Sequence, residues 1–509
     1  MEHSSSPLRA AALIAASTYV STALGFVVSI IVARSLGPND YGQYAYLVWL
    51  SGFLVTIGNH GLSISGIRFI SECVGRGEIN EAKNTHRWLR KQQLASVVGV
   101  LIIFTCSTYF FKPAGWMEST ELLLAIIFTS VAGKAFYIFN ISVAKGYKKF
   151  SIESWSNMIM SIAYTAGAGA LAFGHASLTG FAIFFSIISM AHMAMVAIFF
   201  KKEGIQAGSS TCSPELLSRI KPHLLWTIVL VVVVTLSNKT LETLLLSSLT
   251  GPAEVGYFSI AAALTRGGVD LLSSALTTML MPMMGHAFGE GGIRRVNIIL
   301  SNSLRYFTFL GLILAGVGAL WSELGVLMMY GQKYTPVIDV LRVMMLVGGL
   351  TLTEGAFGSL LSTTDNQKLR AQISILSVIV SFVASVTLVP LYGLQGAVIS
   401  HAITRISIVL LMAWKISTVM NVSLPISGLT RLFLAAGVAV LAISPLLWTS
   451  QTPIMQFVCG IIFCLAFIPA TFIFKAWTQE DLSHIKPLTI KLPIFMQIWL
   501  EKMTTASSL

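Results

Sequence analysis

The stretch ARSLGPNDYGQY at residues 33–44 decides the fold, because it ends one long apolar run and begins another. Gly37 and Pro38 stop the first run, since proline fixes its own backbone angle and restricts the residue before it. Asp40 favours a turn, and the tyrosines around it suit a membrane interface. The stretch therefore predicts a tight turn with an architectural role and no chemistry.

The same pattern returns further along the chain without a gap, which indicates an internal repeat. The matching pairs are Gly37 with Gly251, Pro38 with Pro252, Gly42 with Gly256, Gly75 with Gly289 and Gly77 with Gly291. Chance coincidence of glycines and prolines stays an alternative, since both are frequent in membrane helices. A duplication predicts two six-helix lobes that cross the membrane in the same direction. Transporters built from repeats place the substrate where the halves meet.

The composition is that of a membrane protein. Hydrophobic residues make up 55% of the 509 positions and charged residues only 11%, with a mean hydropathy of +0.79, whereas a soluble domain carries about 25% charge. The five cysteines show no paired spacing, so neither a metal site nor a disulfide framework is expected. A soluble fold is excluded.

Apolar runs long enough to span a bilayer, about 20 residues each, predict about fourteen membrane helices. They lie near residues 10–34, 44–69, 93–111, 121–143, 155–174, 178–200, 223–247, 256–286, 304–325, 337–361, 371–391, 394–416, 428–449 and 453–475. Basic residues collect in the even-numbered loops, including Arg87, Lys148, Lys201, Arg294, Lys368 and Lys415. This asymmetry predicts cytoplasmic termini, and it explains the net charge of +12 without nucleic-acid binding.

The predicted domains follow from the spans. Residues 1–200 form an N-terminal lobe, 201–222 a polar and flexible cytoplasmic linker, 223–418 a C-terminal lobe, 419–476 two further spans, and 477–509 a cytoplasmic tail. Thr478 and Asp481 resemble a helix capping box. The tail beyond them is expected to form an amphipathic helix at the inner membrane surface.

At this point the residues resemble a known family. The run from Ala33 to Tyr44, then Gly61-Leu62 and Arg68-Phe69-Ile70-Ser71-Glu72, is similar to the opening of the polysaccharide transporter branch of the multidrug/oligosaccharidyl-lipid/polysaccharide flippase superfamily. The resemblance covers about the first hundred residues and recurs from Leu249. It implies an all-α, V-shaped exporter like the multidrug exporters of the superfamily. Such an exporter moves an undecaprenyl-pyrophosphate-linked repeat unit to the outer leaflet of the bacterial inner membrane, for O-antigen (lipopolysaccharide) or exopolysaccharide synthesis.

Ionisable residues inside the spans are the candidate site, because each is costly there unless it is paired or faces water. Lys134 and Arg405 lie mid-span without an acidic residue one turn away. A pyrophosphate must cross a region of low dielectric constant, so both cations are expected to bind it. A carboxylate from another helix, such as Glu354, is the alternative partner for either.

Two helix-spaced pairs are weaker candidates, Lys239 with Glu242 and Arg266 with Asp270. Each is either a structural ion pair or part of the transport path, with Lys239 and Arg266 as further substrate cations. Asp270, Glu242 and Glu354 are the carboxylates that could bind a coupling H⁺ or Na⁺.

No catalytic, metal or nucleotide motif is found, so neither enzyme activity nor a cofactor is expected. The alternatives are a lipid II flippase or cation-coupled multidrug exporter of the same superfamily and, from another class, a membrane glycosyltransferase or ligase. The expected partners are the lipid-linked substrate, the bilayer and proteins such as a polymerase.

Overall fold

The computed structural model describes residues 7–59, 61–112, 116, 119–235, 241–364, 366–449, 452–478 and 481, and every regular element among them is a helix. The all-α fold predicted from the apolar runs is therefore confirmed. By contact the chain divides into two compact units, Met1–Ser259 with Val389–Leu394, and Ile260–Leu388 with Gln395–Leu509.

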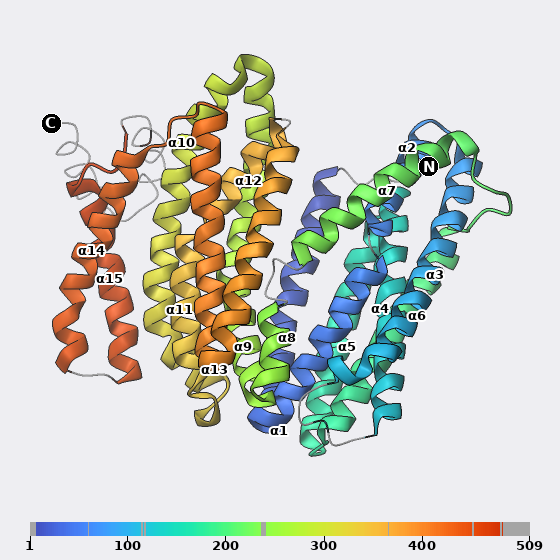
Figure 1. Cartoon of the computed structure of the whole chain (residues 1–509), viewed down its shortest axis with the longest axis horizontal. Coiled ribbons are helices and arrows are strands. Elements are labelled where there is room, and N and C mark those ends of the chain that lie inside the picture. Colours follow the sequence, from blue (N-terminus) through green and yellow to red (C-terminus); the bar gives the residue numbers. More distant parts are fainter. Residues whose placement is uncertain are drawn as a thin grey trace. The chain divides into compact units, whose positions relative to one another are not determined.

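The first unit holds the helices of the first half of the chain (Figure 1). They are α1 (Pro7–Asn59), α2 (Leu62–Gly75), α3 (Ile79–Phe111), α4 (Thr120–Gly146), α5 (Ser151–Phe173), α6 (Leu178–Glu203), α7 (Pro214–Thr235), α8 (Leu241–Leu249) and the start of α9 (Pro252–Thr265). Buried apolar side chains of α2, α3, α4, α6 and α7 form one core, with Phe69, Leu89, Phe139 and Ile220 among its members.

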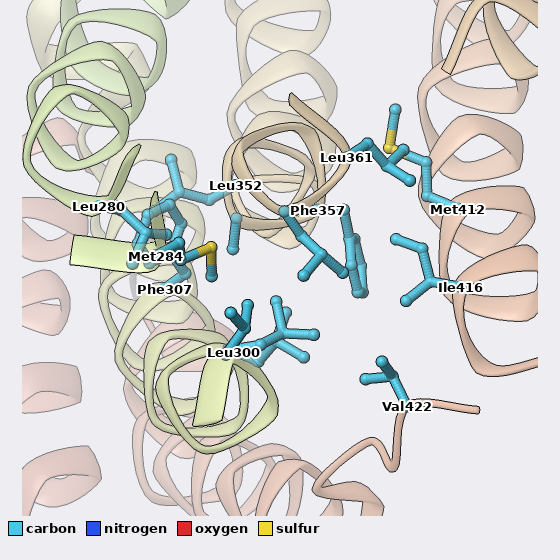
Figure 2. Packing of buried hydrophobic residues seen from close by; sticks show 14 of the residues in the cluster. Leu280, Met284, Leu300, Phe307, Leu352, Phe357, Leu361, Met412, Ile416 and Val422 are labelled. Atoms are coloured by element: carbon cyan, nitrogen blue, oxygen red, sulfur yellow. The ribbon is translucent and has the colours of Figure 1, made fainter. Parts of the chain in front are cut away.

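The second unit holds the remaining helices. They are the end of α9, the π-helical segment η2 (Arg266–Asp270), α10 (Leu271–Met329), the short 3₁₀ helix η3 (Gln332–Tyr334), α11 (Val337–Leu350), α12 (Glu354–Thr363), α13 (Gln367–Val419), α14 (Ile426–Thr449) and α15 (Pro453–Ile473). Figure 2 shows how its core forms, where Leu300 of α10, Phe357 of α12 and Ile416 of α13 converge. The hairpin of α14 and α15 packs against α10.

Three long helices each join all or part of two predicted spans across a kink; the predicted span 44–69 continues into α2, and 256–286 begins in α9. The predicted turn at Gly37 and Pro38 is a break inside α1, where Gly37 has φ 76° and ψ 175°. Gly291 and Gly292 interrupt α10, and Gly393 interrupts α13. Positive φ angles of this kind favour glycine, which has no Cβ to clash. In the described part of the chain, eight helices, counted with these kinked ones, are long and apolar enough to cross a membrane.

The two copies of the repeated turn touch each other within the first unit. A Cβ atom at Gly42 would lie 1.6 Å from the carbonyl oxygen of Pro252, and one at Gly256 would lie 3.2 Å from the Cα of Gly42. The repeat places equivalent glycines face to face, so that α1 and α9 approach to backbone contact. This contact agrees with the architectural role expected of the motif.

The segment expected to be a flexible linker, residues 201–222, is instead attached to the first unit. The amide of Gly208 donates to the carbonyl of Lys83 (2.7 Å), and the amide of Ser213 donates to the Glu81 carboxylate (2.6 Å). Ile205 is also buried. Both donors are backbone amides, so these bonds hold part of the segment against α3, and its predicted hinge role stays a prediction. The compact units divide within α9, and the predicted lobe boundaries stay a prediction.

The capping box at the start of the tail is present. The amide of Asp481 donates to Thr478 Oγ1 (3.2 Å), and the amide of Thr478 donates to Asp481 Oδ2 (2.9 Å). These reciprocal bonds satisfy two amides of a helix start. The predicted amphipathic helix of the tail lies outside the described residues.

Candidate functional site

Lys134 lies in the middle of α4 and faces an aromatic ring of α6. Its Nζ is 4.0 Å from the centroid of the buried Phe185 ring. Among the described residues, no carboxylate lies within ion-pair distance of this ammonium group. A cation over an aromatic face gains about 0.5–2 kcal/mol, but its charge is not neutralised. Lys134 therefore remains free to attract an anion.

Tyrosines lie beside Phe185 and one helical turn from Lys134 in the first unit. The Phe185 ring meets Tyr44 of α1 edge-on at 6.3 Å, and the Tyr44 hydroxyl is hydrogen-bonded to that of Tyr164 on α5. One turn along α4 from Lys134, the Tyr137 ring stacks on His192 at 3.6 Å. Tyrosine and neutral histidine both donate and accept hydrogen bonds. The ring that Lys134 faces thus belongs to a cluster of aromatic and hydroxyl-bearing side chains.

Arg405 has a partner from another helix. Its guanidinium Nη1, on α13, lies 3.0 Å from Glu354 Oε2 at the start of α12, and both side chains are 28% exposed. The alternative of a carboxylate partner is therefore correct for Arg405, whereas no described carboxylate pairs with Lys134. Sequence spacing did not reveal the pair because the two residues lie on different helices.

A stripe of hydroxyl groups on α10 lies beside this pair. Asp270, Ser273, Ser274, Thr277 and Thr278 line a groove of about 340 Å³. A Cβ at Gly355, next to Glu354, would lie 2.7 Å from Thr277 Oγ1, so α12 meets α10 at this stripe. The second unit thus brings three predicted residues into one region: Arg405 and Glu354 as a pair, and Asp270 at the end of the hydroxyl stripe.

Of the predicted site residues, Arg266, Glu242 and Lys239 remain. Arg266 and Asp270 do not form the expected ion pair, and both are exposed at the ends of the π-helical segment η2, whose wider turn interrupts the α-helical spacing on which the pairing was based. Glu242 is buried in α8, with 1% of its surface exposed. Lys239 lies outside the described residues. No group of three or more potential metal ligands is found in the described part of the chain.

Sequence reasoning missed both polar linings. The α10 hydroxyls recur at intervals of four residues inside an apolar run, as Ser273 and Thr277 and as Ser274 and Thr278, and helical periodicity could have identified that stripe. No local signal links Tyr44 with Tyr164, because they are 120 residues apart.

Solved structures share this fold. The lipid II flippase MurJ in an inward closed conformation matches with a TM-score of 0.73 at 16% identity, over 91% of this chain and 98% of that chain. An inward-facing multidrug resistance MATE family transporter of the MOP superfamily matches with a TM-score of 0.62 at 16% identity, over 79% and 96%. A mutant of the Vibrio cholerae MATE transporter VcmN matches with a TM-score of 0.54 at 17% identity, over 81% of this chain and 97% of that chain. No curated protein matches the chain.

The fold is therefore shared with a solved lipid II flippase and with solved multidrug transporters. Residues 8–288 match the model of the polysaccharide biosynthesis protein family. The match covers more than half of the sequence, and the chain belongs to this family.

Proposed function

We propose that the protein moves a lipid-linked oligosaccharide repeat unit, carried on a polyprenyl pyrophosphate, from the inner to the outer leaflet of a bacterial inner membrane by alternating access. The product would serve the synthesis of O-antigen or of an exopolysaccharide. Membership of the polysaccharide biosynthesis family and the flippase-like fold support this proposal.

The observation that carries the proposal is the unneutralised charge of Lys134. A pyrophosphate loses its hydration when it leaves water, and a fixed cation inside the membrane offsets that cost. Lys134 has an aromatic ring beneath it and no carboxylate beside it among the described residues. Arg405 is the second proposed pyrophosphate ligand, and the substrate would compete with Glu354 for it.

A coupling cation is proposed at the carboxylates of the second unit. Asp270 is exposed on the hydroxyl-lined groove and has no ion pair among the described residues, so it is better placed than Glu354, which is held by Arg405. A multidrug exporter of the same fold is the second candidate, because Asp270 and its hydroxyls suit a cationic substrate. The two candidates differ in the sign of charge that they need at Lys134.

Charge changes at Lys134 test the proposal in cells that depend on this protein for surface glycan. Lys134→Gln should reduce export about tenfold or more, since a hydrogen bond to a charged group is worth about 1.5–3 kcal/mol. Lys134→Glu should be worse because it adds repulsion, and Lys134→Arg should retain part of the activity. Lipid-linked oligosaccharide on the inner leaflet is measured, with Lys333→Gln as the control because Lys333 is exposed in the short 3₁₀ helix η3.

Dye efflux in the same strains separates the two functions. A flippase should leave efflux of lipophilic cations at the background level in every variant. Normal glycan export by Lys134→Glu, at normal expression and with dye efflux above background, would overturn the flippase proposal.

A further inference from the structure

A basic groove lies on α3, apart from Lys134 and Arg405. It has a volume of about 330 Å³ and is lined by Arg87, Arg90, Lys91, Leu94, Phe136, Ala207 and Gly208. The three cations occupy one face of the helix, since their spacing is three and four residues. The attached linker supplies one wall through Ala207 and Gly208, and the hydrogen bond from Gly208 to Lys83 holds that wall in place.

The cations of the groove have no ion-pair partner in the described part of the chain. Three other basic residues of the first unit are paired: Lys145 with Glu153 (2.8 Å), Lys149 with Glu203 (3.0 Å) and Arg219 with Glu72 (2.8 Å). Arg87, Arg90 and Lys91 form no ion pair with any described carboxylate. Three unpaired positive charges around one concave surface attract an anion.

The other end of the groove is apolar. Leu94 follows Arg87 by two helical turns, about 10 Å along the axis, and is 54% exposed. Val98 and Ile102 continue the same face, with 46% and 58% of their surfaces exposed. The charged end thus leads directly into an exposed apolar stripe. A molecule that complements the whole surface has a charged head and a hydrocarbon chain.

We propose that this groove binds the phosphate-bearing headgroup of a lipid, whose chain lies along Leu94, Val98 and Ile102. Basic pockets beside membrane helices bind anionic headgroups, and each lysine or arginine near the surface contributes substantially. On the orientation that the basic loops predict, the lipid belongs to the inner leaflet. The site goes beyond the proposed transport function, because it uses none of the residues assigned to the transported pyrophosphate.

Native mass spectrometry of the purified full chain tests the headgroup site. Phosphatidylglycerol should remain bound where phosphatidylcholine does not, and Arg90→Gln with Lys91→Gln should weaken binding on the order of tenfold or more. The matched control is Lys201→Gln with Lys202→Gln, which removes the same charge from exposed positions at the end of α6. An equal loss in both double variants, or no preference for the anionic lipid, would overturn the proposal.

Two further arms identify the source of the phosphate and avoid dependence on mutant folding. If polyprenyl pyrophosphate displaces phosphatidylglycerol from the wild-type protein, the ligand is the lipid carrier. If it does not, the ligand is a phospholipid. Either outcome supports a lipid site. Displacement by inorganic pyrophosphate alone, at equal concentration, would show an anion site without lipid recognition and refute the proposal. A photoreactive acyl chain should crosslink to the peptide that contains Leu94 and Val98, and labelling only elsewhere would contradict the assigned path.

Discussion

At the scale of single residues, mutation can separate two roles of Arg405. One is its structural role as the partner of Glu354, and the other is its proposed role as a pyrophosphate ligand. Neutralising Arg405 alone leaves Glu354 without its partner, which should destabilise the protein by about 1–3 kcal/mol, less than a fully buried pair because both groups are partly exposed. Arg405→Gln combined with Glu354→Gln should restore the melting temperature. If Arg405 binds pyrophosphate, the double variant should still fail to export glycan.

The control for that prediction is the Arg342–Glu323 pair of the same unit, at 2.9 Å. Its double neutral variant should keep glycan export. Export restored in the Arg405→Gln, Glu354→Gln double variant would mean that the arginine is only a structural partner.

Asp481 predicts a pH dependence at the start of the tail. Its carboxylate lies 2.8 Å from Arg305, with 1% and 8% of the two side chains exposed. Burial raises the pKa of Asp481, but hydrogen bonds from Thr478 and Tyr306 and the charge of Arg305 outweigh it, so the pKa lies below its ordinary value. Because the folded-state pKa is depressed, the charged carboxylate stabilises the fold at pH values above its ordinary pKa of about 4. This contribution is lost as the pH falls through the folded-state pKa.

Asp481→Asn should therefore lower the melting temperature at pH 7. Near pH 3 the melting temperatures of the variant and the wild type should differ less. Loss of one partner of a buried pair costs about 3 kcal/mol. Thermal melting of the purified protein at both pH values measures the effect. A pH-independent difference would show that the carboxylate charge does not contribute.

At the scale of elements, the contact between α1 and α9 depends on a missing side chain. Gly42→Ala places a methyl group 1.6 Å from the Pro252 oxygen, so the helices must separate, at a cost of about 1–3 kcal/mol. Gly25→Ala in the same helix meets nothing within 4 Å and should be neutral or slightly stabilising. Melting temperatures of the two variants are compared, and equal values would argue against a close contact.

The helices and the linker show which structural features local sequence can predict. The turn at Gly37 could be predicted because a glycine–proline step ends a helix whatever surrounds it. The attachment of the linker at Gly208 could not, because its partner, the carbonyl of Lys83, is distant in sequence. The loss of regular α-helical spacing at Arg266 and Asp270 was equally hidden, since a π-helical turn leaves no distinct residue pattern here.

At the scale of the whole molecule, the basic loops predict which ends of the helices face the cytoplasm. Single cysteines are introduced after the five natural cysteines are replaced. Asn39→Cys and Lys333→Cys should react with an impermeant reagent from outside, and Lys148→Cys and Arg294→Cys only from inside; all four positions are exposed. Labelling of Asn39 and Lys148 from the same side would contradict the predicted topology.

The sequence by itself determined the all-α class of fold and the break at Gly37, but not every span, since the predicted span 337–361 is divided between α11 and α12. Each apolar run must satisfy its own backbone hydrogen bonds in lipid, so a helix is the local solution regardless of its neighbours. The tertiary structure decided what the intramembrane charges do. Lys134 meets Phe185 and Arg405 meets Glu354 because separate helices pack in a particular rotation and at a particular depth. That packing depends on side chains far apart in the chain, which no local pattern encodes.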